Sequence, residues 1–382
     1  MKSHLYLICA LTLAACSKNF DKPAEMLPHD EQESCSFGIS EFNLTKRPAL
    51  NDEVAKGKPG SSTAAFPNVI LLDFNGHLVS GTMWNVNGDF NCAPANLTAT
   101  EIDNILQRVS ADFTPFNITV TTDENIYNNA NVYKRMRVVV TESWEWFGQA
   151  GGTAYLNSFT WGNNTPCFVF SSLLAYSTKK IAEACSHEAG HTLGLRHQST
   201  YDANGVKISD YNWGQGSGQI GWAPIMGAAY NQNLSLWHYG PNSISATTMQ
   251  NDLAIISNVV GYRSDDYSNS SSGAGSISTS AEGIINSSSD LDFFSLNLNK
   301  TKIISLVPAN VGENNDGANL DLELKIYNNQ GVLQSTVNDP AILNAGTTLS
   351  SGNYYLSVGS TGNQYTSNYG MLSKYKINVT LP

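Results

Sequence analysis

The spacing of apolar residues predicts a mixed α/β region over residues 66–263. Compact apolar runs at 69–74, 117–121 and 136–140 have the length and composition of strands. Between the first two runs, apolar residues recur every three or four positions over 100–109, which is the spacing of a helix. This order of strand, helix, strand and strand is typical of an α/β (α+β) domain with a mixed sheet.

Two strands and a long helix are expected further along the same region. Residues 150–156 contain glycines that weaken a central strand, so they favour an edge position. Residues 167–170 are a second short apolar run, and residues 178–193 have the pattern of an amphipathic helix. The apolar stripe of that helix consists of Ala182, Cys185, Ala189 and Leu193.

The pattern changes to strict alternation near the C-terminus. Apolar and charged residues alternate over 320–326, and further strands are expected at 355–358 and 375–379. Such strands predict an all-β sandwich over residues 281–382. The preceding residues 264–280 are rich in Ser, Gly, Asp and Asn, which is the composition of a linker, so the sandwich is expected to fold independently.

The first sixteen residues have the features of an export signal. An apolar run over 5–13 follows Lys2 and is too short to remain as a transmembrane helix. The run ends in Leu-Ala-Ala-Cys16, which resembles a bacterial lipobox. That resemblance implies acylation of Cys16 and a lipid anchor in the cell envelope; a plain cleaved signal and a secreted product are the alternative. Residues 17–65 are polar and aperiodic, as in a tether or short pro-segment.

Charge excludes one class of partner. The formal net charge is −11, and such a surface repels phosphate backbones, so we expect no nucleic acid partner. The carboxylates that give this charge are available to bind structural Ca²⁺, although the sequence does not locate a site.

Residues 187–197, HEAGHTLGLRH, carry the candidate chemistry. His187 and His191 are four positions apart, so on a helix both imidazoles point to one side. Gly194 can adopt a positive φ that ends the helix and returns His197 to the same point. Three imidazoles leave one position of a tetrahedral Zn²⁺ open for water, as in catalytic zinc sites, and Glu188 lies where a general base would reach that water.

This segment is the metzincin signature, HExxHxxGxxH. The family implies a later methionine turn, which the segment 223–227, APIMG, resembles with Met226 beneath the ligands. Some metzincins carry a ligating Tyr two residues after this Met; here that position is Ala228, and Tyr230 is a possible substitute. The resemblance covers about residues 68 to 263, and residues 72–77 resemble the opening strand of a group of exported bacterial metzincins.

The resemblance implies a zinc-dependent endopeptidase that acts on extracellular or periplasmic proteins. In metzincins, an edge strand above the zinc binds extended peptides by β-addition. The matching residues here are Gly151, Gly152, Thr153, Ala154 and Tyr155. Two alternatives remain open: a lipid-anchored binding protein that uses a metzincin fold, and a zinc hydrolase of non-peptide amides. The presence of Glu188 argues against the binding protein, and the peptide-binding strand at residues 151–155 argues against the non-peptide hydrolase.

The last hundred residues resemble the pre-peptidase C-terminal domains of secreted bacterial peptidases. The stretches that carry this resemblance are residues 289–295, 319–324 and 352–358. The family is β-sandwich in fold and is associated with targeting, secretion or substrate binding. No ligand of this domain can be assigned from the sequence.

Four cysteines remain after removal of the signal and acylation of Cys16, and an even number in an exported chain suggests two disulfides. Three pairings are possible, and Cys167–Cys185 with Cys35–Cys92 is the expected one. In some metzincins a pro-segment thiolate fills the open zinc position. Cys35 is upstream of the catalytic region, but its neighbours do not match that motif, so the disulfide is favoured.

Overall fold

The computed structural model describes residues 32–35 (as backbone), 47, 68–309 and 317–382. The export signal, Cys16 with its predicted acylation, and nearly all of the predicted tether over 17–65 lie outside these residues. The described chain belongs to one compact unit, Glu31–Pro382. Within it, none of the helices has the length and apolar content needed to cross a membrane.

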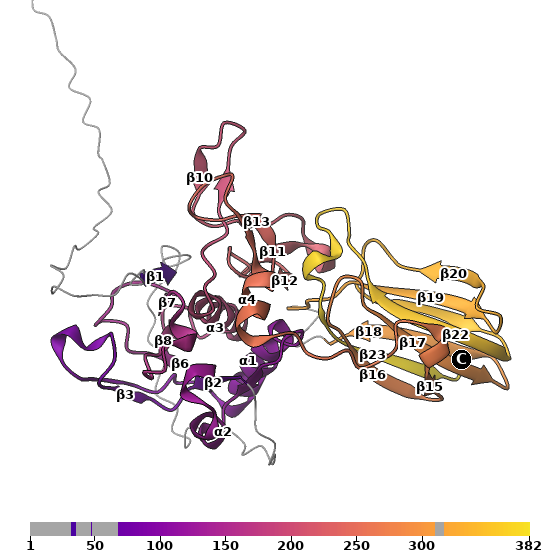
Figure 1. Ribbon diagram of the computed structural model, residues 1–382, viewed down its shortest axis with the longest axis horizontal. Helices are drawn as coiled ribbons and strands as arrows, with labels where there is room; N and C mark the ends of the chain where they lie inside the picture. Colours follow the sequence, from indigo (N-terminus) through magenta and orange to yellow (C-terminus); the bar gives the residue numbers. More distant parts are fainter. Residues whose placement is uncertain (1–31, 36–46, 48–67, 310–316) are drawn as a thin grey trace, which may run out of the picture. The chain divides into compact units, whose positions relative to one another are not determined.

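A six-stranded mixed sheet organises the N-terminal part, as the sequence predicted (Figure 1). Strands β8, β6, β2 and β5 are parallel neighbours, whereas β7 runs antiparallel to β8 and β1 runs antiparallel to β7. The strands in sheet order are β1 (Gln32–Cys35), β7 (Gly152–Tyr155), β8 (Cys167–Phe170), β6 (Arg135–Thr141), β2 (Val69–Asp73) and β5 (Thr119–Thr121).

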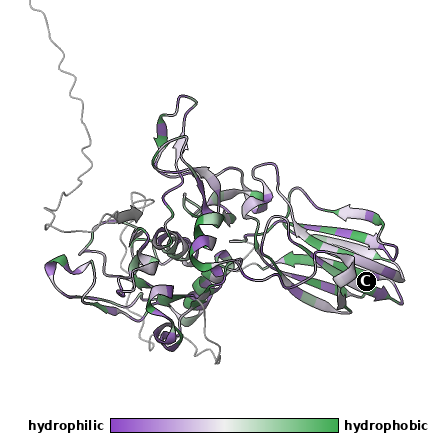
Figure 2. Cartoon of the chain, in the orientation of Figure 1, coloured by the Kyte–Doolittle hydropathy of each residue, from purple (hydrophilic) through white to green (hydrophobic). Residues whose placement is uncertain are grey.

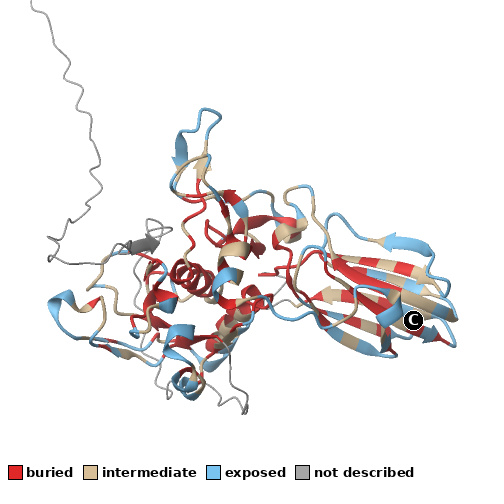
Figure 3. Ribbon diagram, in the orientation of Figure 1, coloured by how far each residue is buried: buried red, intermediate tan, exposed pale blue. Residues whose placement is uncertain are grey.

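Two long helices cover this sheet. Helix α1 (Ala99–Asp112) begins with a capping box formed by Thr98 and Glu101, which satisfies backbone donors at the first turn. Helix α3 (Thr178–Thr192) begins at the N-cap Ser177 and is buried along almost its whole length (Figure 3). The predicted helices are thus confirmed. Two more were not predicted, α2 (Glu124–Asn129) and α4 (Asp252–Val260).

Short strand pairs fill the connections. Before α1, β3 (His77–Val79) pairs with β4 (Phe90–Cys92). Between α3 and α4 there are three pairs, of which the parallel β11–β12 pair leads into Met226. These pairs are β9 (Thr200–Tyr201) with β10 (Lys207–Ser209), β11 (Trp222–Pro224) with β12 (Leu234–Leu236), and β13 (Tyr239–Pro241) with β14 (Met249–Asn251).

The C-terminal part is all-β, with a five-stranded and a four-stranded sheet whose buried apolar residues belong to one core cluster. Hydrophobic and hydrophilic residues alternate along these strands (Figure 2). In β19 the alternation holds as predicted, with Leu322, Leu324 and Ile326 buried. Strand β15 lies inside the range predicted as a linker, so the sandwich begins earlier than expected. The strands are, in sheet order, β15 (Gly275–Ile277), β17 (Leu291–Leu298), β22 (Gly352–Ser360), β19 (Leu322–Asn328) and β20 (Leu333–Val337), then β16 (Ser280–Ile285), β23 (Ser373–Thr380), β18 (Lys302–Pro308) and β21 (Ala345–Leu349).

A buried polar network joins the sandwich to the two long helices. The Asn319 amide donates to Asp112 Oδ1 at 2.7 Å and to the Ser235 carbonyl at 2.5 Å. Asp112 also accepts a hydrogen bond from Ser186, the residue before His187 on α3. Burial raises the pKa of Asp112 to about 8, and the hydrogen bonds from Ser186 and Asn319 oppose this rise. The sandwich is therefore held by more than its covalent connection.

The predicted Cys167–Cys185 disulfide is wrong, and Cys92 is not in a disulfide; the side chain of Cys35, its predicted partner, lies outside the described residues. Cys92, Cys167 and Cys185 are free cysteines. Cys167 on β8 and Cys185 on α3 are fully buried in the core, and burial raises the pKa of both thiols. They behave as small apolar side chains, because a buried thiol that stays protonated is a poor nucleophile for disulfide formation.

Candidate metal centre

Helix α3 places two of the three predicted histidine ligands. His187 and His191 are one turn apart, and their ring centroids lie 4.7 Å from each other. The chain then leaves the helix at Gly194, whose φ is +105°. A side chain there would be strained, and its Cβ would lie 2.6 Å from Asn157 Oδ1. This turn brings His197 to 4.8 Å and 5.1 Å from the other two rings.

Backbone carbonyls orient the rings. His187 Nδ1 lies 2.8 Å from the Ile225 carbonyl oxygen, and His191 Nδ1 lies 2.7 Å from that of Leu195. Since a carbonyl only accepts, each Nδ1 carries the proton, and each Nε2 presents a lone pair. His187 Nε2 is buried and has no hydrogen-bond partner among the described residues. A buried nitrogen lone pair without a hydrogen-bond partner is available to coordinate a metal ion.

The ligand atoms converge as a zinc site requires. One ligand atom from each of the three histidines lies within 4.8 Å of the others. His191 Nε2 and His197 Nε2 are 3.1 Å apart. Two nitrogens bound tetrahedrally at about 2.0–2.1 Å would be roughly 3.3 Å apart, so the spacing fits with little movement. These residues fit Zn²⁺ without any further ligand from the described chain.

Burial keeps the imidazoles neutral. It lowers the pKa of His187 to about 4, and it lowers the pKa of His191 and His197 well below the usual range. For His191 the other two histidines lower the pKa further. A neutral imidazole is the form that binds metals, so the three groups are ready to ligate throughout the neutral pH range.

Glu188 follows His187 on α3, and its side chain packs against strand β7. Its carboxylate is fully buried. A Cβ on Gly152 would lie 2.6 Å from Glu188 Oε1, so only glycine allows this approach. The predicted general base is therefore packed against the backbone of the strand that was predicted to bind substrate.

Met226 lies under the histidines. It is fully buried, and its Sδ would be 2.6 Å from a Cβ built on Gly190, which stands between the two ligands of α3. The preceding residue, Ile225, is the one whose carbonyl holds His187, and its N–H donates to the Leu236 carbonyl of β12 at 2.9 Å. The segment thus supports two sides of the histidine cluster.

Strand β7 does not have a free edge. Of the predicted peptide-binding residues, Gly152 to Tyr155 form the strand, and Gly151 precedes it. One side of β7 pairs with β8 and the other pairs with β1 from the N-terminal segment. The prediction of an edge strand is corrected: β7 is second in the sheet, because β1 covers it.

Tyr211 lies against the histidines and was not predicted from the sequence. Its ring centroid is 4.6 Å from that of His197 and 6.3 Å from that of His187, and the residue is buried against Ala228. Tyr230, the considered substitute, packs in the main hydrophobic core instead. Tyr211 belongs to no motif, and only the folded chain brings it to the histidines.

Tyr211 should support zinc binding through its ring. We expect Tyr211→Phe to keep the zinc affinity of the wild type, since the ring that packs on His197 remains. Tyr211→Ala should lower that affinity by roughly 10-fold or more, the usual cost of removing a group that orients a ligand. Competitive titration with a zinc chelator measures both values. Equal losses in the two variants would show that the hydroxyl, and not the ring, is responsible.

Two further groups lie in the C-terminal part. Asp265, Asp266 and Asp292 place one carboxylate oxygen each within 4.8 Å of the others. Asp292 is fully buried, and its Oδ1 and that of the nearby buried Asp290 have no hydrogen-bond partner among the described residues. Burial raises the pKa of Asp292 to about 8. A hard cation such as Ca²⁺ would stabilise the ionised form of these buried carboxylates by coordinating their oxygens.

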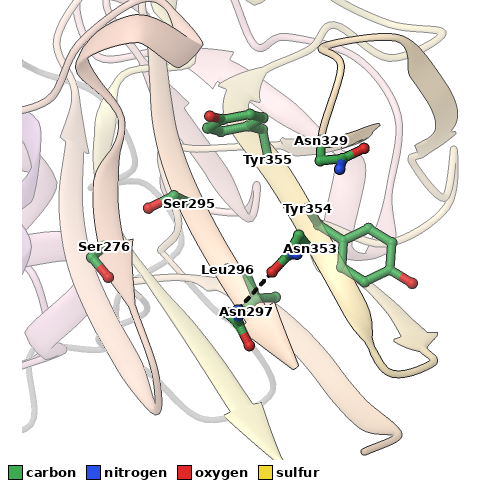
Figure 4. Close-up of a pocket in the computed structure, with 8 residues that line it drawn as sticks. All are labelled: Ser276, Ser295, Leu296, Asn297, Asn329, Asn353, Tyr354 and Tyr355. Carbon is green, nitrogen blue, oxygen red and sulfur yellow. Dashed lines mark hydrogen bonds between the residues drawn. The ribbon is translucent and has the colours of Figure 1, made fainter. Parts of the chain in front are cut away.

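The second group is a hollow of about 300 Å³ on the outer face of the five-stranded sheet (Figure 4). Its described lining contains amides, hydroxyls and tyrosine rings and no charged side chain. Asn297 donates to Asn353 Oδ1 at 2.6 Å across β17 and β22. The lining residues are Ser276, Ser295, Leu296, Asn297, Asn329, Asn353, Tyr354 and Tyr355.

Comparison with known proteins adds little. No protein family and no curated protein matches the chain. The pre-peptidase C-terminal domain of a collagenase from Bacillus anthracis is similar over 31% of this chain and 97% of its own, with 15% identity and a TM-score of 0.20. A surface-associated copper-binding protein of Methylomicrobium album BG8 is similar over 29% of this chain and 98% of its own, with 10% identity and a TM-score of 0.20. At these TM-scores neither likeness carries an argument, so the sandwich rests on its own strand pairing.

Proposed function

We propose that this protein is a zinc-dependent endopeptidase of the metzincin type. The observation that carries the proposal is the convergence of three buried imidazoles from a segment that also carries the buried carboxylate of Glu188, the residue after His187. A structural zinc site would have four protein ligands, whereas the histidine cluster offers three and leaves a position for substrate or water. Glu188, adjacent to that position, supplies the base that hydrolysis needs.

In the proposed mechanism, the three histidines hold the metal and Glu188 transfers the proton. Zinc, when bound by His187, His191 and His197, supplies Lewis acidity that lowers the pKa of water and polarises a carbonyl. Glu188 accepts the proton of the attacking water and delivers it to the leaving amine. Gly152 lets the Glu188 carboxylate lie against β7, so a peptide bound along this strand in place of β1 would have its backbone next to the base. The substrate is therefore a protein or peptide in extended conformation.

The sandwich fits the role of an accessory domain. The three stretches that resemble pre-peptidase C-terminal domains fall on or next to β17, β19 and β22, which are neighbours in one sheet. An exported chain with a lipid at Cys16 would hold the catalytic part at a membrane surface of the cell envelope. We propose this location, and acylation of Cys16, on the sequence of the signal alone.

Incubation with a mixed peptide library tests the proposed function. Zinc-loaded wild type should cut internal peptide bonds, and removal of the zinc by a chelator should stop the cleavage. Hydrolysis confined to non-peptide amides would favour the alternative hydrolase.

We also propose that Asp265, Asp266 and Asp292 bind a structural Ca²⁺. Added calcium should raise the melting temperature of the wild type, and Asp292→Asn should abolish that rise, whereas Asp339→Asn, a change at an exposed acid of the same domain, should not.

Because the folded-state pKa of Asp292 is raised to about 8, the ion-free protein should lose stability as pH rises from about 4 to about 8. The rise caused by calcium should therefore be larger at pH 8 than at pH 5. Differential scanning calorimetry with and without calcium measures the rise at each pH. A melting temperature that calcium does not change at pH 8 would contradict the site.

A binding role is the second candidate function, and the neutral hollow on the sandwich favours it. Tyrosine rings, amides and hydroxyls without charge suit an uncharged polyhydroxylated ligand such as a neutral glycan. Affinity electrophoresis in gels that contain soluble neutral polysaccharide tests this. Retardation of the wild type and not of Tyr355→Ala would support it, and equal mobility with and without polysaccharide would reject it.

A further inference from the structure

His197 is the one histidine of the cluster that α3 does not carry, so its position depends on the loop that follows the helix. Its two neighbours in this loop, Arg196 and Gln198, are both hydrogen-bonded to buried side chains where β14 meets α4. Those side chains belong to Gln250 and Asp252, each 54 positions further along the chain than its partner. The loop that carries the third ligand is therefore held from a distant segment.

The Gln250 side chain pairs with both backbone groups of Arg196. The Arg196 N–H donates to Gln250 Oε1 at 2.9 Å, and Gln250 Nε2 donates to the Arg196 carbonyl at 2.8 Å. One side-chain amide thus exchanges two hydrogen bonds with a single residue, as a paired residue of an antiparallel strand would. Because the amide is planar and rigid, the two bonds fix the backbone immediately before His197 in position and in direction.

Asp252 in turn fixes the Gln250 amide. It is fully buried, and its Oδ1 accepts hydrogen bonds from Gln250 Nε2 at 2.9 Å and from Gln198 Nε2 at 3.2 Å. Its Oδ2 accepts the backbone N–H of His238 at 2.9 Å. The residues on both sides of His197 are therefore held by one buried polar network that contains none of the three histidines of the cluster.

We propose that Gln250 is a positioning residue of the metal centre, whose amide sets the place of His197 and thereby the affinity for zinc. This inference rests on the proposed function, since it takes the three histidines as the zinc ligands. Helix α3 holds His187 and His191 without help from Gln250. When the amide is lost, the backbone before His197 gains freedom, and zinc must order the third ligand as it binds, which lowers its affinity.

The variant Gln250→Met provides the test, because it removes both hydrogen bonds to Arg196 and keeps a side chain of similar length. Asn68→Leu is the matched control. Asn68 is also a buried amide that bridges backbone groups, the carbonyls of Asn117 and Val260, at 2.8 and 3.0 Å, and it is outside the histidine cluster. Each change removes buried hydrogen bonds, so both should lower the melting temperature.

Two measurements on the full chain distinguish positioning from stability. Competitive titration with a chelator should give a zinc dissociation constant about 10-fold higher or more for Gln250→Met, and one within about 2-fold of the wild type for Asn68→Leu. In the Co²⁺-loaded proteins, the visible absorption that reports coordination geometry should change for Gln250→Met alone. Gln250→Asn, whose amide is one methylene too short to reach both groups, should change both values in the same direction as Gln250→Met.

The outcomes separate this inference from the proposed function. Wild-type zinc affinity and an unchanged Co²⁺ spectrum in the Gln250 variants would overturn the inference and leave the zinc site intact. An equal loss of affinity in Asn68→Leu would also overturn it, because the loss would then follow from lower stability. If the wild type itself binds no zinc, the peptidase proposal and this inference fail together.

Discussion

Glu188→Ala is expected to hold one zinc ion per chain and to lose nearly all peptide hydrolysis. The three histidines are untouched, and alanine has the best helix propensity, so α3 should form as before. Loss of a general base lowers the rate by about 10²–10⁴-fold, and Glu188 is proposed to act in two proton transfers, so the loss should reach the upper end. That range corresponds to about 3–5 kcal/mol of barrier.

Two companion variants sharpen this prediction. Glu188→Gln keeps the shape of the side chain but not its basicity, and it should lose as much activity as Glu188→Ala. Glu183→Gln changes another buried carboxyl on α3, one that bonds Lys179 and Ser235 and not the histidine cluster, so it should stay active. Metal analysis by mass spectrometry and single-turnover peptide cleavage give the two readouts. Near-normal activity of either Glu188 variant would contradict the proposed base.

His191→Ala is expected to lose zinc and activity together. Two imidazoles remain, and two neutral ligands do not hold the ion tightly. The three rings lie 4.7–5.1 Å from one another, so removal of the His191 ring leaves only the His187–His197 pair. The zinc content after dialysis should fall from about one per chain to near zero, the opposite of the result for Glu188→Ala.

His238 supplies the matched control for this change. It is another buried histidine whose pKa burial lowers to about 4, but its ring packs on Trp222, outside the histidine cluster. His238→Gln should therefore retain zinc. His77, which lies 3.6 Å from Asp73, should likewise be dispensable for the metal. Zinc retained by His191→Ala, or lost by His238→Gln, would mean that the ligands have been wrongly assigned.

The local part of the site could be predicted from the sequence because its geometry is local. His187 and His191 share a helix face by periodicity alone, and Gly194 has the positive φ that the motif demands. The alternation of the sandwich strands is also a local signal. In each case, neighbouring residues in the sequence determine the outcome.

Features that depend on distant segments could not be predicted. Strand β1 is polar and aperiodic, so nothing in it indicates that it pairs with β7 across more than a hundred residues. Tyr211 reaches the histidines only because the loop after α3 folds back. The cysteine count suggested disulfides, but burial in the core made the thiols apolar packing groups. Strand β15 was not predicted because its segment is rich in serine. It pairs in parallel with β17, which is not the next strand in the sequence.

Cleavage-site profiling of a mixed peptide library by the zinc-loaded full chain, with Glu188→Ala as the blank, tests directly whether this protein is a zinc endopeptidase. We expect new peptide termini at internal bonds with wild type, none with Glu188→Ala, and recovery of cleavage when zinc is added back to the chelated wild type. A folded wild-type protein that holds zinc at the three histidines and cuts no peptide bond would contradict it.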